Sequence, residues 1–270
     1  MAATLAAFFI MQSAQAAPAV QQTVNAETTR VILVGDSTMA TRTGYGDALC
    51  SLFQPHIKCV NLARGGRSSK SFRVEGLWDN VMTLLRIAAR DNESKRITYV
   101  LIQFGHNDQP GKPERSTDLV TEFPVNITRY VDEVRSLGGL PVLVTPLTRR
   151  TFRNGTLRND LVPWADVIRQ IAKVKSVPLI DLNATSAAAV ALMGTTEADT
   201  LAEEPPPKVA LPTSLSAVTD QNRIEPNGVA KSRFDYTHLG AKGATLFSKM
   251  VAGEMVQAVP ALAAHLRTDA

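Results

Sequence analysis

Apolar and polar positions alternate along the chain with two different periods. Short apolar runs bounded by Gly, Pro and polar residues are typical of buried strands, whereas apolar residues spaced three and four apart indicate helices that pack on one side. The predicted strands are residues 31–34, 57–60, 97–104, 141–145 and 178–181. The predicted helices are residues 45–53, 74–90, 117–137, 161–175, 184–193 and 241–257. Strands that alternate with helices predict an α/β fold, with helices on both faces of a parallel sheet in one domain.

Prolines make two parts of this pattern less regular. Pro124 falls inside the third predicted helix, and we expect the regular helix to begin there because proline fits only the first helical turn. Residues 194–230 include the prolines of 205–207, Pro212 and Pro226, which predict a long irregular connection. Connections of that length inside a compact domain are usually functional or mobile.

The stretch from Val31 to Met39 joins a buried strand to a group of polar residues. Gly35 permits a sharp turn at the strand end, and Ser37 follows in the turn. A serine at the carboxyl end of a buried strand lies where ligands of open α/β sheets bind. The alternative is that Ser37 only caps a following helix. Ser37 therefore becomes a catalytic candidate only if its chemical partners occur elsewhere in the chain.

The charge of the chain excludes one class of partner and says little about others. The chain carries 29 Lys and Arg residues against 25 Asp and Glu residues, a net charge of +4, with no run of basic residues. We therefore expect no nucleic-acid partner. A mildly basic surface is compatible with an acidic polymer as substrate.

The first 16 residues resemble a secretory signal. A short apolar core at 5–11 precedes Ala14-Gln15-Ala16, an A-x-A-like cleavage site, although the usual basic residues at the start are missing. The core is too short to cross a bilayer and no later stretch is long and apolar enough, so we expect no membrane partner. These features predict a signal peptide at 1–16, a single domain at 17–270, and a secreted or periplasmic protein.

Cys50 and Cys59 are the two cysteines of the chain. In an oxidising compartment they can form one disulfide bond that closes a small loop. The alternative is two separate buried thiols. We keep the disulfide as the working hypothesis because it agrees with export.

A set of residues at predicted strand ends and loops matches the needs of ester hydrolysis by a serine. Such a site needs a nucleophile, a base, a group that orients the base, and donors for the oxyanion. The candidates are Ser37 as nucleophile, His238 as base, Asp235 as orienting carboxylate, and Ser37, Gly66 and Asn107 as oxyanion donors. Each residue also has an ordinary alternative: a helix cap for Asp235, a surface position for His238, a turn for Gly66 and an Asx-turn for Asn107. Because loops at the carboxyl ends of parallel strands share one sheet edge, the combination is stronger than its members.

Four sequence blocks resemble those of the SGNH (GDSL-type) hydrolases, and their fuller strings resemble the rhamnogalacturonan acetylesterase group. The strings are G-D-S-T-M-A at 35–40, G-G-R-S-S-K-S-F at 65–72, F-G-H-N-D-Q at 104–109 and D-Y-T-H-L-G-A-K-G-A at 235–244. The resemblance implies a flavodoxin-like sheet of five parallel strands and removal of acetyl groups from pectin. By matching positions it implies a triad of Ser37, Asp235 and His238, and an oxyanion hole of Ser37, Gly66 and Asn107. Gly66 is preferred to Gly65 because it directly precedes Arg-Ser. The mechanism needs no metal and no cofactor.

Basic residues near these blocks are candidates for substrate contacts. Arg64 and Arg67, with Lys70 and Arg73 behind them, follow the second predicted strand and can meet the carboxylates of an acidic polysaccharide. His106, beside Asn107, is a candidate for substrate contact or for an orienting or packing role. Arginines at 149, 150, 153 and 158 follow the fourth strand. The alternative for both groups is a solvated basic loop.

The leading prediction is a secreted esterase that deacetylates rhamnogalacturonan and acts as a monomer. One alternative keeps the site and changes the substrate, to xylan, another glycan or a general short-chain ester. A lipase is disfavoured because the loops around the site are polar and basic. A second alternative is a binding protein for an acidic polysaccharide without catalysis, which the intact set of candidate residues disfavours.

Overall fold

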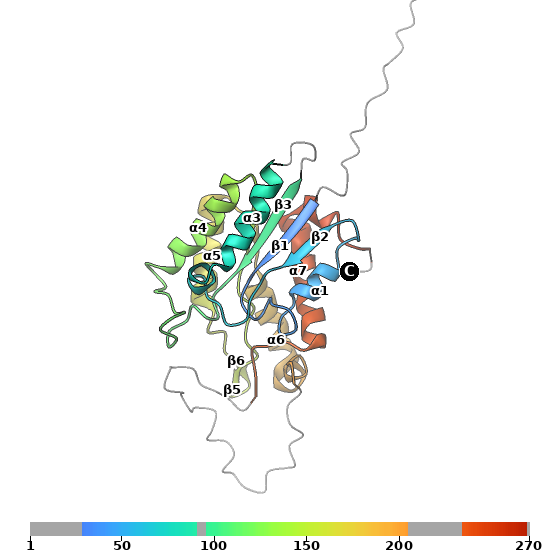
Figure 1. Cartoon of the computed structure of the whole chain (residues 1–270). Coiled ribbons are helices and arrows are strands. Elements are labelled where there is room, and N and C mark those ends of the chain that lie inside the picture. Colours follow the sequence, from blue (N-terminus) through green and yellow to red (C-terminus); the bar gives the residue numbers. More distant parts are fainter. Residues whose placement is uncertain (1–28, 91–95, 205–233, 269–270) are drawn as a thin grey trace, which may run out of the picture.

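The centre of the protein is a five-stranded parallel sheet with the strand order β2-β1-β3-β4-β7 (Figure 1). The computed structural model describes residues 29–90, 96–204 and 234–268. The sheet consists of β1 (Thr29–Gly35), β2 (Lys58–Asn61), β3 (Ile97–Gln103), β4 (Leu140–Val144) and β7 (Leu179–Ile180). Each pair of neighbours is parallel. The predicted flavodoxin-like fold is therefore confirmed, and all five predicted strands form this sheet.

Helices cover both faces of the sheet, so that the protein has three layers (Figure 1). The first face carries α3 (Leu77–Arg90), α4 (Phe123–Ser136) and α5 (Val162–Lys175). The second face carries α1 (Gly46–Ser51), α6 (Leu182–Asp199) and α7 (Ala241–Ala258), with the short α8 (Pro260–Ala263) beside α7. α4 begins at Phe123 with Pro124 in its first turn, as expected.

The alternation of side chains along the central strands divides the core into two apolar clusters. Val31 and Leu33 of β1 belong to the cluster under α1, α6 and α7, whereas Ile32 and Val34 belong to the cluster under α3, α4 and α5. All four side chains are fully buried. Successive residues of a strand point to opposite faces of a sheet, which explains why β1 is apolar at every one of these positions.

Three parts of the chain differ from the sequence prediction. The helix predicted at 74–90 is two helices, α2 (Ser71–Val74) and α3, because Gly76 between them has a φ of +73°. The arginine-rich segment that follows β4, for which no strand was predicted, contains a hairpin of β5 (Phe152–Arg153) and β6 (Thr156–Leu157). Its turn is Asn154-Gly155 with φ of +51° and +76°, the positive values that a type I′ turn requires.

The third difference concerns the long connection after the sixth helix. Residues 194–199 were predicted as irregular, but they continue α6 beyond Gly194, whose φ of +67° and ψ of 176° kink the helix. Residues 205–230 of the predicted connection lie outside the described residues, as does the predicted signal peptide at 1–16. In the described part of the chain no helix has the length and apolar character to cross a membrane.

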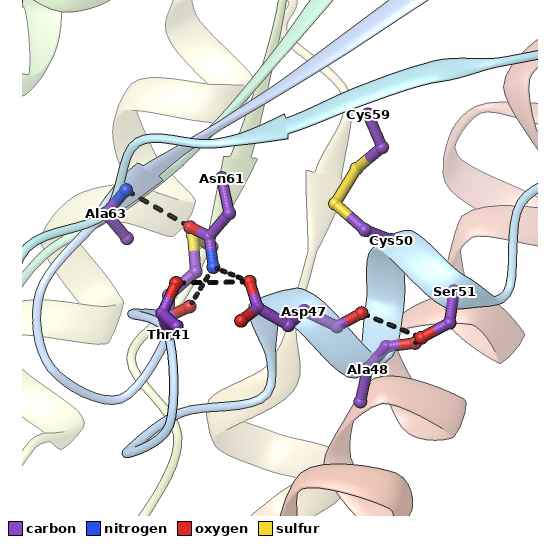
Figure 2. The surroundings of a disulfide bond; sticks show 9 residues. Thr41, Asp47, Ala48, Cys50, Ser51, Cys59, Asn61 and Ala63 are labelled. Carbon is purple, nitrogen blue, oxygen red and sulfur yellow. Dashed lines mark hydrogen bonds between the residues drawn. A yellow bond between two sulfur atoms is a disulfide. The ribbon is translucent and has the colours of Figure 1, made fainter.

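A disulfide bond joins Cys50 of α1 to Cys59 of β2 (Figure 2). Beside it, the Asn61 side-chain amide donates to the Asp47 carboxylate at 2.8 Å and to the Met39 carbonyl at 3.0 Å. Gly46 allows this close approach, since a Cβ there would lie 2.2 Å from the Met39 carbonyl oxygen. Covalent and polar links together hold the edge strand β2 against the segment that follows β1.

Replacement of both cysteines by serine should lower the free energy of unfolding by about 2–3 kcal/mol, because the bond restricts a short loop of the unfolded chain. Urea unfolding of the wild type and of the Cys50→Ser, Cys59→Ser double variant measures the difference. A reductant should destabilise the wild type and leave the double variant unchanged. Equal unfolding midpoints for all four samples would contradict a stabilising disulfide.

Candidate active site

Ser37 lies in a tight turn directly after the central strand β1. The Asp36 carbonyl accepts hydrogen bonds from the N–H groups of Met39 at 3.2 Å and Ala40 at 3.0 Å. Gly35 is needed at the strand end because a Cβ there would lie 2.8 Å from the Gln103 carbonyl oxygen. Ser37 is 7% exposed. The turn thus presents a nearly buried serine at the carboxyl edge of the sheet.

A chain of buried hydrogen bonds holds this turn from below. The Tyr45 hydroxyl donates to Gln103 Oε1 at 2.7 Å, and Gln103 Nε2 donates to Thr38 Oγ1 at 2.7 Å. The Thr38 hydroxyl in turn donates to Asp36 Oδ1 at 2.8 Å. All four residues are fully buried. A satisfied buried network allows one arrangement of its members, so the residues on both sides of Ser37 are held in place.

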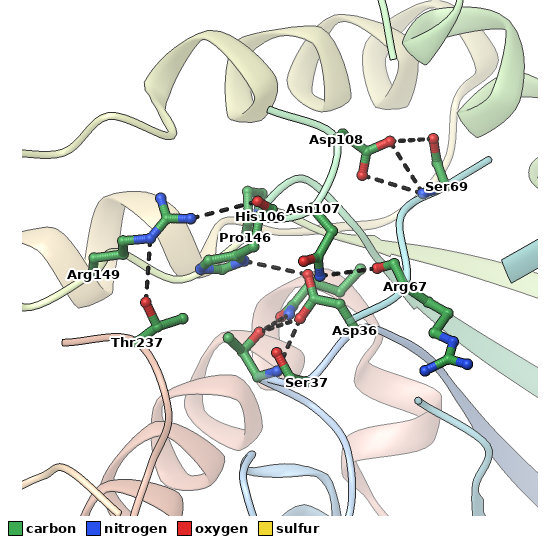
Figure 3. A network of polar contacts seen from close by, with 12 residues as sticks. Asp36, Ser37, Arg67, Ser69, His106, Asn107, Asp108, Pro146, Arg149 and Thr237 are labelled. Atoms are coloured by element: carbon green, nitrogen blue, oxygen red, sulfur yellow. Dashed lines mark hydrogen bonds and ion pairs between the residues drawn. The ribbon is translucent and has the colours of Figure 1, made fainter. Parts of the chain in front are cut away.

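Asp36 also faces His106, from the loop after β3 (Figure 3). Their atoms Oδ2 and Nδ1 lie 3.3 Å apart. Burial lowers the pKa of His106, so the ring is neutral at neutral pH. Burial opposes ionisation of Asp36 as well, but His106 and the hydrogen bonds from Thr38 outweigh it and lower the pKa of Asp36. A carboxylate therefore lies beneath the candidate nucleophile with a neutral imidazole against it.

Asp235 and His238 contact each other within one turn of the chain. His238 Nδ1 lies 2.5 Å from Asp235 Oδ2, and Asp235 Oδ1 accepts from the N–H groups of Thr237 at 2.7 Å and His238 at 2.9 Å. The hydrogen bond to Asp235 raises the pKa of His238. Burial opposes ionisation of Asp235, but the bonds from His238 and Thr237 lower its pKa well below the usual range. The pair has the geometry of a base and its orienting carboxylate. Nδ1 contacts Asp235, so Nε2 is the ring nitrogen left to accept a proton.

Two hydrogen bonds connect this turn to the serine turn. The Thr43 hydroxyl donates to the Ser37 carbonyl at 2.8 Å, and the N–H of Leu239 donates to the Thr43 carbonyl at 2.9 Å. The charge of Asp36 is close enough to contribute to the raised pKa of His238. In the described chain no hydrogen bond joins the Ser37 hydroxyl to His238, and such bonds are often made only when substrate is bound.

The candidate oxyanion donors lie at the same edge. Within the described residues the backbone N–H groups of Ser37 and Gly66 have no acceptor. The Asn107 amide donates to the Arg67 carbonyl at 3.2 Å and accepts from Lys112 Nζ at 2.9 Å. One N–H of Asn107 remains for an oxyanion. Lys112, which the sequence analysis missed, therefore fixes which end of this amide is the donor.

Gly65 and Gly66 differ in what a side chain at each position would contact. A Cβ on Gly65 would lie 3.8 Å from the Ser37 Cβ, whereas one on Gly66 would meet the Arg115 guanidinium at 3.1 Å. Gly66 has a φ of +75°, which favours glycine. Gly66 thus has a structural reason to be glycine, whereas a side chain at Gly65 would make only an ordinary contact with Ser37. The choice of Gly66 as the oxyanion donor stays a prediction.

A buried carboxyl group ties the loops after β2 and β3 together. Asp108 accepts from the Ser69 hydroxyl at 2.5 Å and the Ser69 N–H at 3.1 Å (Figure 3). It also accepts from the Thr117 hydroxyl at 3.1 Å. Burial raises the pKa of Asp108 to about 7, against the lowering effect of these hydrogen bonds. Asp108 follows Asn107 directly, so these hydrogen bonds also hold the backbone of Asn107 in place.

The residues predicted to contact the substrate differ in their exposure and in their partners. Arg67 is half-buried and pairs with Glu75 at 2.7 Å, and Arg73 pairs with Glu133 at 2.6 Å. Arg64 is exposed and is free to meet a ligand. His106 is 2% exposed and lies against Asp36, so its position is that of an orienting residue rather than of a substrate contact. The substrate roles of Arg64 and Arg67 stay predictions. Both tryptophans, Trp78 and Trp164, are buried in the core.

The carboxyl edge of the flavodoxin-like sheet carries a serine, a His-Asp pair and N–H donors without an acceptor among the described residues, which are the groups that a serine hydrolase needs. Residues 33–246 match the GDSL-like Lipase/Acylhydrolase family, and the chain belongs to that family. The protein is therefore a carboxylic-ester hydrolase.

Two proteins of Bacillus subtilis are similar to the chain. Rhamnogalacturonan acetylesterase RhgT of Bacillus subtilis is 32% identical over 231 residues, which cover 83% of this chain and 88% of that one. The probable rhamnogalacturonan acetylesterase YesY of the same organism is 35% identical over 159 residues, 56% of this chain and 69% of that one.

Solved structures show the same fold at lower sequence identity. The acetylxylan esterase Axe2 of Geobacillus stearothermophilus has a TM-score of 0.54 at 17% identity, over 84% of this chain and 93% of that one. The Bacillus subtilis protein YXIM has a TM-score of 0.60 at 21% identity, over 85% of this chain, which spans only 56% of that protein.

Activity should rise with pH because His238 must be neutral to accept a proton. The midpoint of this rise should lie above 6.5, the ordinary pKa of histidine, because the hydrogen bond to Asp235 raises the pKa of His238. In Asp235→Asn the midpoint should fall and turnover should drop about 10⁴-fold, since the productive tautomer is lost. The pH dependence of kcat measures both effects. Asp166→Asn, which removes an exposed carboxylate on α5, is the control. An unchanged midpoint in Asp235→Asn would contradict the assigned pair.

Proposed function

We propose that this protein is a secreted serine esterase that removes acetyl groups from rhamnogalacturonan through Ser37, His238 and Asp235. The observation that carries the proposal is the Asp235–His238 contact, which the Leu239–Thr43–Ser37 hydrogen bonds attach to the turn of the candidate nucleophile. The identity to RhgT over most of both chains supports the choice of substrate.

The first half of the reaction forms an acetyl-enzyme. His238 Nε2 takes the hydroxyl proton of Ser37 as Oγ attacks the acetyl carbonyl carbon. The resulting oxyanion accepts hydrogen bonds from the N–H groups of Ser37 and Gly66 and from the Asn107 amide, and loss of one such donor typically costs about 3–4 kcal/mol of transition-state stabilisation. His238 then protonates the departing sugar oxygen, the C–O bond to the sugar breaks, and Asp235 stabilises the imidazolium in the interval.

The second half releases acetate. A water molecule gives one proton to His238 Nε2 and attacks the acetyl carbon, and the same three donors hold the second oxyanion. Collapse of this intermediate breaks the bond to Ser37 Oγ, which takes the proton back from His238. Every step of the proposed cycle uses side chains and backbone N–H groups of this chain together with water.

Basic groups beside the oxyanion donors support an acidic polysaccharide as substrate. Arg115 lies over Gly66, Lys112 holds Asn107, and Arg64 is exposed next to Gly65. Guanidinium groups bind carboxylates with two parallel hydrogen bonds, which suits the galacturonate carboxylates of such a polymer. The fold likeness to Axe2 carries no argument for xylan, so xylan is a comparison substrate in the test.

Acetate release from acetylated rhamnogalacturonan, acetylated xylan and p-nitrophenyl acetate tests both the mechanism and the substrate. Ser37→Ala and His238→Ala should each lose at least about 10⁴-fold in kcat, while Ser51→Ala, an exposed serine on α1, should match the wild type. We expect fast release of acetate from the pectic polysaccharide, rhamnogalacturonan, and not from the other two substrates. Release from xylan and the small ester but not from pectin would contradict the substrate. Full activity in Ser37→Ala would contradict the mechanism.

A further inference from the structure

Arg150 is a fully buried arginine that none of the catalytic roles above uses. It lies in the segment after β4, and its guanidinium points at the turn that contains Asp235 and His238. Nη2 donates to the carbonyl oxygens of Asp235 at 2.8 Å and His238 at 2.8 Å, and Nη1 donates to that of Thr237 at 3.4 Å. The N–H of Arg150 donates to the Tyr236 carbonyl at 2.9 Å. Four consecutive carbonyl groups, from 235 to 238, therefore accept hydrogen bonds from one residue.

Within the described part of the chain, the polar contacts of Arg150 give it no other role. Its guanidinium forms no hydrogen bond to a carboxylate, and its Nε has no partner in the described part of the chain. Burial lowers the pKa of Arg150 to about 10, so the group is still a cation at neutral pH, attracted by the more distant charges of Asp235 and Asp199. A buried cation is costly and is often replaceable by an apolar side chain without loss of stability. Its contacts to the turn are the feature that an apolar residue could not replace.

Arg150 adds a second external support to the turn, beside the Leu239–Thr43–Ser37 hydrogen bonds that begin just after it. The Asp235–His238 bond and the two bonds from the backbone to Asp235 are all made within residues 235–238. Such internal bonds shape the turn but do not determine its distance from Ser37, which belongs to a different element. Arg150 connects the turn to the carboxyl end of β4, a strand of the same sheet as β1.

The neighbouring residue extends this support to the next loop. Arg149 Nε donates to the Thr237 hydroxyl at 3.2 Å, and its Nη2 donates to the His106 carbonyl at 3.4 Å (Figure 3). Asp160 accepts two bonds from Arg149 Nη1, at 3.0 and 2.9 Å, which fix that guanidinium. His106 in turn lies against Asp36, beside Ser37. The two arginines thus join the turn of His238 to the loops on which the nucleophile depends.

We propose that Arg150 is a positioning residue for catalysis: its two-pronged guanidinium holds the backbone of residues 235–238 so that His238 faces Ser37. The inference rests on the proposed triad. Because the Asp235–His238 pair is formed within the turn, loss of Arg150 moves the pair as a unit and leaves its titration nearly unchanged. The expected defect is therefore in kcat, with the pH midpoint and the KM close to those of the wild type.

The test compares Arg150→Ala and Arg150→Lys with a matched variant, Arg30→Ala. Arg30 is also buried and also donates to a carbonyl, that of Leu84 at 3.1 Å, but it lies near the amino end of β1, away from the site. For Arg150→Ala, kcat should fall about 100-fold with KM within about threefold of the wild type, since misplacement of a catalytic group by about 1 Å costs that much. Arg30→Ala should lower the urea midpoint and keep kcat per folded molecule.

Added guanidinium ion, at concentrations well below those that unfold the protein, should restore part of the kcat of Arg150→Ala with saturation. It should not raise the kcat of Arg30→Ala or of Ser37→Ala. Arg150→Lys keeps the charge, but its ammonium nitrogen ends one bond short of the Nη2 position and it has no second nitrogen for the Thr237 carbonyl, so its kcat should also fall. This variant decides the matter if Arg150→Ala does not fold.

Wild-type kcat in a folded Arg150→Ala or Arg150→Lys variant would overturn the inference. A loss of kcat in Arg150→Ala that guanidinium does not reverse, or a shift of the pH midpoint as large as that in Asp235→Asn, would also overturn it. Full activity in Ser37→Ala would instead overturn the proposed function. The two failures are thus distinguishable within one set of variants.

Discussion

The parallel pairing of β1 between β2 and β3 is the constraint on which the site depends. The pairing brings the carboxyl ends of all three strands to one edge, so the turns that follow them meet there. Ser37, Gly66 and Asn107 come from these three turns. Close approach at this edge is possible because Gly35 lacks a side chain where a Cβ would meet the Gln103 carbonyl. The buried Tyr45–Gln103–Thr38–Asp36 chain then fixes the end of β1 relative to the end of β3.

Three aspartates at this edge have three different environments, and their roles follow from them. Asp235 is partly exposed and accepts three hydrogen bonds, so it stays ionised beside His238. Asp36 is buried and ionised, because Thr38 and His106 compensate for its burial. Asp108 is buried among neutral hydroxyl groups, and burial raises its pKa to about 7. Asp36 and Asp235 each face an imidazole, but His106 beside Asp36 is buried and its pKa is lowered, whereas His238 beside Asp235 is partly exposed and its pKa is raised. The Asp235–His238 pair therefore suits a base and its carboxylate, whereas Asp36 and Asp108 hold loops together.

Much of the fold and the core of the candidate site could be predicted from the sequence, because both depend on local patterns. The buried strands have β-branched apolar runs, and the parallel sheet follows from their alternation with helices. Residues such as Lys112 and Arg150 could not be predicted, because their contacts are to residues brought close only by the tertiary fold. Arg150 looked like one member of a solvated basic loop, although it is fully buried. By contrast, the hairpin turn at Asn154-Gly155 had a local signal, and the polar character of its surroundings concealed it.

Covalent labelling tests the central claim, that Ser37 is a nucleophile activated by His238, most directly. Diethyl p-nitrophenyl phosphate reacts with activated serines by loss of p-nitrophenol and leaves a stable phosphoester. Mass spectrometry of the wild type should show one added diethylphosphoryl group, located on Ser37 by peptide mapping. Labelling should be far slower in His238→Ala and absent in Ser37→Ala. Labelling of another residue, or equal rates in the wild type and His238→Ala, would contradict the claim.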